Sequence, residues 1–148
     1  MKLLSVSSLY WPETGGIEVV LDTLLPALRD DHCIEVVALT GVGRRTSPGL
    51  DAQRGVSVER ISFADLRGDD AGSWLRLQGR IRRAIDGYRP DVVMLHSVGP
   101  MTWMAARCLA GRGVPTVYVD HGPRATDRRQ ELQVVTIADS VIAVSQAT

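Results

Sequence analysis

Apolar residues along this chain occur in short runs that alternate with stretches of helical spacing. Most runs are rich in β-branched residues and nearly continuous, which is typical of strands buried on both faces of a sheet. They predict strands at Lys2–Ser7, Ile34–Leu39, Val56–Ile61, Asp91–Leu95, Thr116–Val119 and Ser140–Val144. The intervening stretches predict helices at Ile17–Arg29, Ser73–Tyr88, Pro100–Ala110 and Asp127–Ala138. This alternation indicates a parallel sheet covered by helices.

The expected helices carry apolar faces at helical spacing. In the first helix this face consists of Ile17, Val20, Leu21, Leu24 and Leu28. Pro26 lies within the same helix and predicts a kink or an early end. In the second helix the inward residues are Trp74, Leu77, Ile81, Ile85 and Tyr88. Between the second and third strands, Gly41–Gly55 is rich in Gly, Arg, Ser and Pro, which predicts a long mobile loop.

The alternation also predicts how the strands are arranged. Right-handed crossovers favour the doubly wound order 3-2-1-4-5-6, counted along the chain. The fold class is therefore α/β, a mostly parallel Rossmann-like sheet of six or seven strands. Ligands of such sheets bind at the carboxyl ends of the strands, beside the point where the order reverses. We accordingly expect functional residues directly after the first, fourth and fifth strands.

Composition excludes several classes of protein. The chain has 148 residues, of which 45% are hydrophobic, and its 17 basic residues balance 17 acidic ones. A disordered chain is excluded by this apolar fraction, and the zero net charge argues against a partner such as nucleic acid, held by bulk charge. Cys33 and Cys108 match no metal-ligand spacing, so we expect buried free thiols and no metal site.

The loop after the first strand contains Gly15 and Gly16 at the start of the expected helix. Two glycines let a ligand approach the backbone closely, and the first amides of a helix attract anions such as phosphate. A simple tight turn is the alternative reading of the pair. The loop has no Gly-x-Gly-x-x-Gly fingerprint, and the chain has no Gly-x-x-x-x-Gly-Lys phosphate loop.

A histidine follows each of the next two strands at this edge. His96 comes after the fourth strand and His121 after the fifth, so both are expected to face the same crevice. Histidine can donate a hydrogen bond to a sugar hydroxyl or a phosphate oxygen, and it titrates near neutrality. Two ordinary packed histidines are the alternative. No Gly-x-Ser-x-Gly elbow is present, and no glycosidase carboxylate pair can be identified.

These loops resemble those of the family 4 glycosyltransferases, which have the GT-B fold. The resemblance rests on four segments that occur in the family's order: Tyr10–Glu18, Asp91–Ser97, Pro115–Gly122 and Ala138–Ser145. The first contains the proline followed by Gly-Gly-x-Glu, and the third ends in His-Gly. Each motif is loose alone, but together they span most of residues 1–148.

The resemblance implies a retaining transferase that moves a sugar from a nucleotide diphosphate to an acceptor, usually without a bound metal or other cofactor. Whether the donor is of the UDP or the GDP type stays open. Gly15, Gly16 and Gly122 would contact the donor, and His121 would be the catalytic residue beside the reacting sugar. The acceptor, a sugar or a lipid-linked sugar, would be bordered by Tyr10, Trp11, Glu13, Thr14, His96 and Ser97.

Two features of the family have no counterpart in these residues. A second Rossmann-like domain binds most of the nucleotide and carries a Glu-x₇-Glu element. We therefore expect residues 1–148 to be the N-terminal, acceptor-side half of a longer two-domain enzyme, inactive by itself and prone to self-association. The alternatives are a non-catalytic subunit of a split transferase and, less well supported, a stand-alone nucleotide-binding module.

The expected location is the cytoplasm. The first apolar run, Met1–Val6, is interpreted as a strand rather than an export signal, and no apolar run approaches the roughly 18 residues of a transmembrane helix. Arg76, Arg80 and Arg83 lie on one side of the second helix. A basic helix face can dock on an anionic inner-membrane surface, although a solvated face is the simpler reading.

Overall fold

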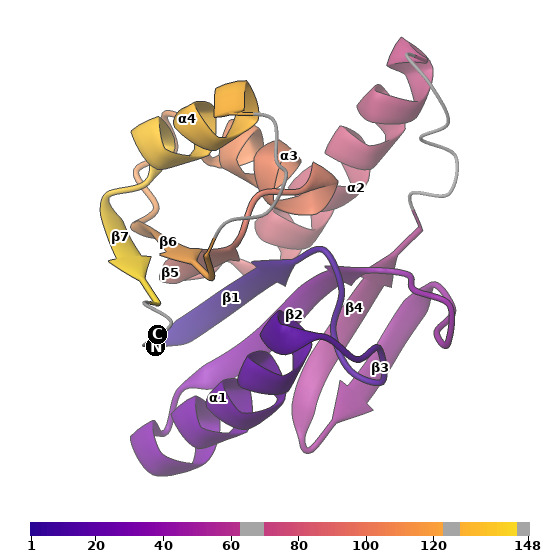
Figure 1. The fold of residues 1–148 in the computed structure, drawn as a ribbon, viewed down its shortest axis with the longest axis vertical. Helices are drawn as coiled ribbons and strands as arrows, with labels where there is room; N and C mark the ends of the chain where they lie inside the picture. Colours follow the sequence, from indigo (N-terminus) through magenta and orange to yellow (C-terminus); the bar gives the residue numbers. More distant parts are fainter. Residues whose placement is uncertain (63–69, 123–127, 145–148) are drawn as a thin grey trace.

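The computed structural model describes residues 1–62, 70–122 and 128–144 (Figure 1). The strands are β1 (Lys2–Ser7), β2 (Glu35–Gly41), β3 (Gly49–Gln53), β4 (Val56–Ile61), β5 (Val92–His96), β6 (Thr116–Asp120) and β7 (Ser140–Ala143). The helices are α1 (Gly16–His32), α2 (Ala71–Tyr88), α3 (Pro100–Leu109) and α4 (Arg128–Ile137). Every strand and helix predicted from the sequence is present, with ends that differ by a few residues.

The described strands form one sheet in the order β3-β4-β2-β1-β5-β6-β7. Leaving out β3, this is the predicted order 3-2-1-4-5-6, and all of these neighbours pair in parallel. The doubly wound α/β fold is thus confirmed. The order reverses at β1, which pairs with β2 on one side and with β5 on the other.

The prediction of a long loop over Gly41–Gly55 is wrong in part, because residues 49–53 form β3. This strand pairs antiparallel with β4, and Gln53 lies opposite Val56. The two residues between them, Arg54 and Gly55, have positive φ angles of 47° and 78°. Two positive φ angles define the mirror-image turns that suit a right-twisted hairpin. An Arg-Gly turn is a weaker sequence signal than Asn-Gly, so the strand was missed.

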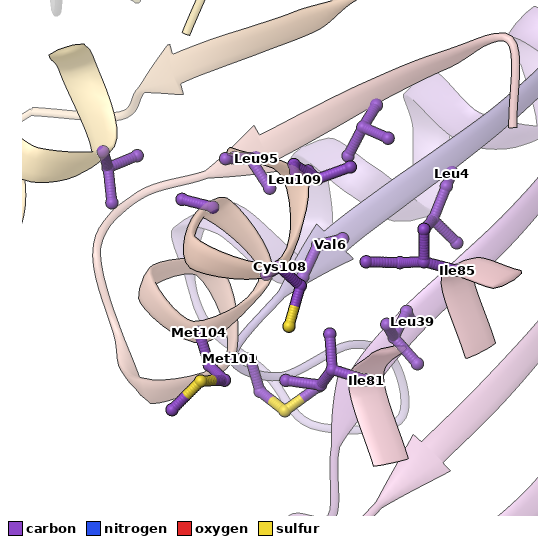
Figure 2. Packing of buried hydrophobic residues seen from close by; sticks show 14 of the residues in the cluster. Leu4, Val6, Leu39, Ile81, Ile85, Leu95, Met101, Met104, Cys108 and Leu109 are labelled. Carbon is purple, nitrogen blue, oxygen red and sulfur yellow. The ribbon is translucent and has the colours of Figure 1, made fainter. Parts of the chain in front are cut away.

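The helices cover both faces of the sheet (Figure 1). α1 packs on one face over β2 and β4, and α3 lies on the other face over β1 and β5 with α2 and α4 beside it. Side chains alternate accordingly along β1: Leu3 joins the core under α1, whereas Leu4 and Val6 join the core under α2 and α3. Figure 2 shows the second core, where Ile81 of α2 packs among these strand residues.

The apolar face of α1 is rotated relative to the predicted one. Ile17, Leu21 and Leu25 are buried, whereas Val20 is 41% exposed. The early end predicted at Pro26 does not occur, since α1 continues to His32. A proline at this position leaves the carbonyl of Asp22 without its helical amide donor. Arg54 Nη1 donates to that carbonyl at 3.4 Å, so the β3–β4 turn supplies a replacement.

The two cysteines are free but differ in exposure. Cys108 is buried in the core under α2 and α3, as predicted. Cys33 is exposed, so its predicted burial is wrong. It follows α1 as the left-handed capping residue, with a φ of 53° and its amide hydrogen-bonded to the carbonyl of Leu28. A residue that ends a surface helix in this way points away from the core.

The core under α2 makes a testable prediction about stability. Ile81→Ala removes a fully buried side chain and is expected to lower the free energy of unfolding by about 2–5 kcal/mol. Leu75→Ala on the same helix is the matched control, because Leu75 is 66% exposed; its effect should stay within about 0.5 kcal/mol. Urea unfolding followed by circular dichroism measures both. Equal losses would show that α2 does not face the sheet as described.

Candidate functional site

The loops after β1, β5 and β6 meet at the carboxyl edge of the sheet, as predicted for the point where the strand order reverses. The loops after β1 and β5 are in direct contact: a Cβ atom added to Gly99 would lie 2.2 Å from Ser8 Oγ. Only glycine fits there without moving Ser8. The amide of Ser97 donates to the carbonyl of Val119 at 3.0 Å, which ties the ends of β5 and β6 together.

The two histidines lie side by side at this edge. His96 Nδ1 is 3.2 Å from His121 Nε2, so one of the two nitrogens donates to the other. His96 is only 1% exposed, whereas His121 is half-buried. Burial, reinforced by His121, lowers the pKa of His96 to about 3. His96 is therefore neutral at physiological pH and holds the more accessible His121 ring through this contact.

The start of α1 is open above Gly16. Gly15 is the capping residue, and no described side chain accepts from the first amides of the helix. Gly16 is exposed, and a Cβ atom placed on it would have no described neighbour within 4 Å. Above Gly15, in contrast, a Cβ atom would lie 2.3 Å from Glu18 Oε2. An anion attracted to these amides thus has room over Gly16, while the Glu18 carboxylate covers Gly15.

Gly122 follows the histidine of the β6 loop. Its φ of 99° lies in a region that side chains disfavour, and its amide donates to Asp120 Oδ1 at 3.0 Å. A Cβ atom added to Gly122 would have no atom of the described residues within 4 Å. Residues 123–127, which include Arg124, lie outside the described residues.

The residues expected to border an acceptor differ in accessibility. Trp11 is 44% exposed and Thr14 is exposed, whereas Tyr10 is fully buried in the core under α1. Burial, with a smaller effect of Asp22, raises the pKa of Tyr10 to about 12. Ser97 is 8% exposed, with a positive φ of 54°. Trp11 and Thr14 are therefore the most accessible of these side chains.

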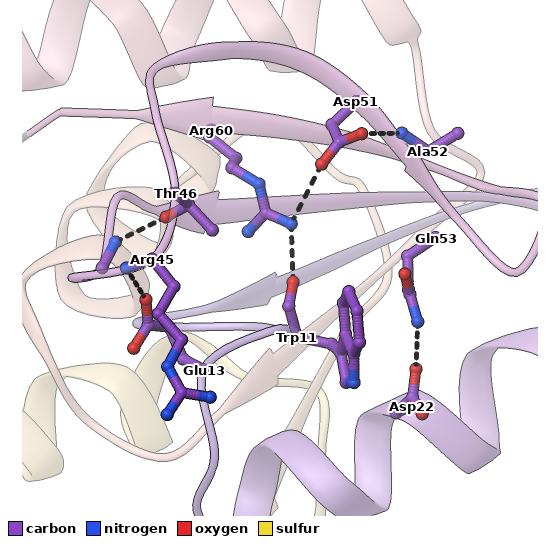
Figure 3. A network of polar contacts seen from close by, with 10 residues as sticks. Trp11, Glu13, Asp22, Arg45, Thr46, Asp51, Ala52, Gln53 and Arg60 are labelled. Atoms are coloured by element: carbon purple, nitrogen blue, oxygen red, sulfur yellow. Dashed lines mark hydrogen bonds and ion pairs between the residues drawn. The ribbon is translucent and has the colours of Figure 1, made fainter.

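Glu13 connects the β1 loop to the segment before β3. Its Oε1 accepts a hydrogen bond of 2.5 Å from the amide of Arg45 (Figure 3). A Cβ atom on Gly43 would overlap the Glu13 carboxyl group, which shows how closely the two segments pack. This contact draws the 41–48 segment to the same edge of the sheet as the histidines.

Sequence reasoning missed one charged residue at this edge, Arg60. Its side chain is buried and Nη2 donates to the carbonyl of Trp11 at 2.6 Å (Figure 3). The signal was available, because the two-residue period of a strand places Arg60 on the same face as the buried Val56 and Val58. A charged residue on the buried face of a strand is rare enough to single out.

Other parts of the described chain offer less. A cavity of about 550 Å³ lies among the helices and is lined by residues such as Gln78 of α2, Arg107 of α3 and Leu132 of α4, with none from the described parts of the loops after β1, β5 and β6. Among residues 1–62, 70–122 and 128–144, no three His, Cys, Asp or Glu side chains form a group that could hold a metal ion. Within the same ranges, none of the helices is long and apolar enough to cross a bilayer.

The family model of glycosyltransferase family 4 matches residues 14–148. The chain therefore belongs to this family, and the resemblance seen in its loops is confirmed. No curated protein matches it significantly.

Solved structures show the same fold at low identity. MurG from Acinetobacter baumannii matches 99% of this chain with a TM-score of 0.68 at 11% identity. Sucrose-phosphate synthase from Thermosynechococcus elongatus matches 97% with a TM-score of 0.68 at 14% identity. UDP-GlcNAc 2-epimerase from Neisseria meningitidis, bound to UDP-GlcNAc, matches 93% with a TM-score of 0.63 at 11% identity. The chain spans 39–42% of these proteins and has the fold of one GT-B half.

The burial of His96 predicts how the free energy of unfolding depends on pH. Between pH 6.5, the ordinary pKa of histidine, and about 3, the pKa of folded His96, the unfolded chain binds a proton that the folded chain does not. This residue therefore makes stability fall as pH is lowered, by up to about 1.4 kcal/mol per pH unit. Urea unfolding at pH 7.5, 6.5, 6.0 and 5.5 should show this loss.

His96→Gln is expected to flatten this pH dependence, whatever its effect at neutral pH. His32→Gln is the control, because His32 is exposed at the end of α1 and should leave most of the slope in place. If the wild type and His96→Gln have parallel profiles above pH 5.5, His96 is not the buried neutral group described.

Proposed function

We propose that this chain forms the acceptor-side domain of a retaining glycosyltransferase that uses a nucleotide diphosphate sugar. The observation that carries the proposal is the arrangement at the carboxyl edge, where the open start of α1 lies at the same edge as the His96–His121 pair. Membership of glycosyltransferase family 4 supports the reaction class. The donor is a nucleotide sugar of the UDP or GDP type, and the acceptor is a sugar or a lipid-linked sugar.

The start of α1 is suited to the donor diphosphate. Uncapped amides and the positive end of the helix dipole stabilise an anion, and they do so most as charge develops on a leaving group. The diphosphate enters over Gly16, since Glu18 covers Gly15. During transfer the acceptor oxygen bonds to the anomeric carbon, the bond to the diphosphate oxygen breaks, and the acceptor's hydroxyl proton passes to the departing diphosphate.

His121 takes the place of the catalytic residue in this proposal. It is the more accessible member of the pair, and its Nε2 contact with the neutral His96 orients its ring. From there it donates a hydrogen bond to the transferred sugar beside the reacting centre. His96 acts through His121 and is a positioning residue, while Trp11, Glu13, Thr14 and Ser97 border the acceptor with the buried Tyr10 beneath them.

A second domain completes this site. The chain spans 39–42% of the solved structures it resembles, so most contacts to the nucleotide are assigned to a second Rossmann-like domain. Titration of the isolated 148-residue chain with UDP-glucose, UDP-GlcNAc and GDP-mannose should then give dissociation constants of about millimolar or weaker. Calorimetry is the measurement. Micromolar binding by the chain alone would mean that no second domain is needed for the donor.

Gly16→Ala tests the donor site in a transferase that contains this chain. The added methyl group meets no atom of the described residues, so stability should not fall, yet it occupies the approach of the diphosphate. We expect sugar transfer from the nucleotide sugar to fall by roughly tenfold or more, mainly through a higher KM for the donor. The product should keep the anomeric configuration of the donor, as seen by proton NMR.

Gly87→Ala is the matched control. Gly87 is an exposed glycine in α2, and a Cβ atom placed on it would also have no described atom within 4 Å. Unlike Gly16, it does not belong to the loops after β1, β5 and β6. Its transfer activity should equal that of the wild type, and its stability should rise by about 0.5–1 kcal/mol. Equal activity in Gly16→Ala and Gly87→Ala would show that the diphosphate does not bind at the start of α1.

A further inference from the structure

Arg60 is a buried cation with few acceptors. Arg60 is only 4% exposed, and its Nε and Nη1 atoms have no hydrogen-bond partner among the described residues. Nη2 donates to the neutral carbonyl of Trp11 at 2.6 Å, and it lies 3.5 Å from Asp51 Oδ2. A guanidinium group carries five N–H donors and stays charged at every physiological pH. Most of its donors therefore have no matching oxygen in the part of the chain that the structure describes.

This arrangement is costly for a structure that serves stability alone. Burying a charge without a hydrogen-bonded counter-charge carries a large desolvation penalty, and such groups are normally paired or bound to a ligand. Asp51 cannot fill this role, because its side chain is 58% exposed and the contact is at the long end of an ion pair. The unmatched donors indicate that a further anionic oxygen belongs beside Arg60.

A cavity beside Arg60 has room for such a group. It measures about 290 Å³, compared with the roughly 30 Å³ that one water molecule occupies in the liquid. Among the described residues of its lining, Arg60 and Arg45 are the cations and Asp51 is the one acidic residue, so the lining is net positive. Thr46 and Ser47 add hydroxyl groups to the wall. Arg45 is exposed at the rim, and Glu13 holds its backbone amide in place.

The cavity borders the site already described. Trp11 and Pro12 of the loop after β1 form one wall, and the same Trp11 provides the carbonyl that anchors Arg60 (Figure 3). Arg60 stands near the end of β4, whose neighbour is β2, whereas the open start of α1 follows β1. The cavity is therefore bordered by Trp11 and Pro12 of the loop after β1, but not by Gly15 or Gly16. It is distinct from the proposed diphosphate position over Gly16.

We propose that Arg60 and the cavity formed by residues 45–51 with Trp11 and Pro12 bind an anionic oxygen group, a phosphate or a carboxylate, of the sugar acceptor. That the anionic group belongs to the sugar acceptor rests on the proposed function, whereas the anion site itself does not. Arg60 supplies the buried charge, and Arg45, Thr46 and Ser47 supply donors at the rim. This would select acceptors that carry a negative charge over neutral ones.

Binding is tested on the 148-residue chain with inorganic phosphate and, separately, malonate as probes, at constant ionic strength set with chloride. Two-dimensional ¹H–¹⁵N NMR follows the Arg60 Nε–H and the Thr46 amide, and it follows the Gly16 and Ile17 amides as reporters of the α1 start. We expect saturable shifts at Arg60 and Thr46 with at least one probe. The tighter probe tells whether the group is a phosphate or a carboxylate.

Three variants and one matched control make the test specific. Arg60→Met should weaken binding at Thr46 by roughly tenfold or more, because the buried charge is lost. Asp51→Asn, at an exposed side chain, should tighten it severalfold by removing the competing carboxylate. Arg45→Gln should weaken it, whereas Arg44→Gln, one residue away and not part of the lining, should leave it unchanged.

The outcomes separate this inference from the proposed function. Shifts confined to Gly16 and Ile17, no saturable shift with either probe, or an unchanged constant in Asp51→Asn would overturn the anion site, whether or not Arg60→Met folds. If the anion binds at Arg60 but a longer protein containing this chain transfers no sugar, the anion site is supported and the proposed reaction is wrong. In an active transferase, Arg60→Met should raise the KM for the acceptor and leave the KM for the donor unchanged.

Discussion

β1 hydrogen-bonds to β2 on one side and to β5 on the other, and the rest of the structure depends on this double pairing. The helix that follows β1 packs on one face of the sheet, and the helix that follows β5 packs on the other. The two connecting loops therefore begin side by side, in contact through Ser8 and Gly99, and then lead to opposite faces of the sheet. Chemistry-bearing residues gather at this edge because backbone pairing in the sheet holds the loop ends in register.

Burial decides the electrostatics of this edge. His96 is kept neutral by its surroundings, so the buried member of the histidine pair offers hydrogen-bonding groups without a positive charge. The uncapped amides at the start of α1 present the positive end of the helix dipole at this edge, and their effect falls off within the first turn. In the proposed function the diphosphate must therefore come close to the backbone, which is why the open space over Gly16 matters more than the net charge of the chain.

At the outer part of the same edge, Arg60 provides positive charge in a different way. There the positive charge is a buried side chain, anchored by the Trp11 carbonyl and incompletely matched by Asp51. The antiparallel strand β3 contributes to this arrangement, since it pairs beside β4 at the edge of the sheet and carries Asp51. The two proposed anion sites thus differ in physical origin, one being backbone amides and the other a guanidinium group, and each can be altered without the other.

By itself the sequence determined the strand order, the positions of the helices and the loops that hold Gly16, His96 and His121, because these follow from local periodicity and the handedness of crossovers. It did not determine the continuation of α1 past Pro26, the strand β3 or the surroundings of Arg60. Each of these depends on a contact outside the element itself: Arg54 with the Asp22 carbonyl, β3 with β4 across a two-residue turn, and Arg60 with the Trp11 carbonyl. Only the tertiary structure decides such contacts, because they join residues that lie far apart in the chain or in neighbouring strands, where no local pattern specifies the partner.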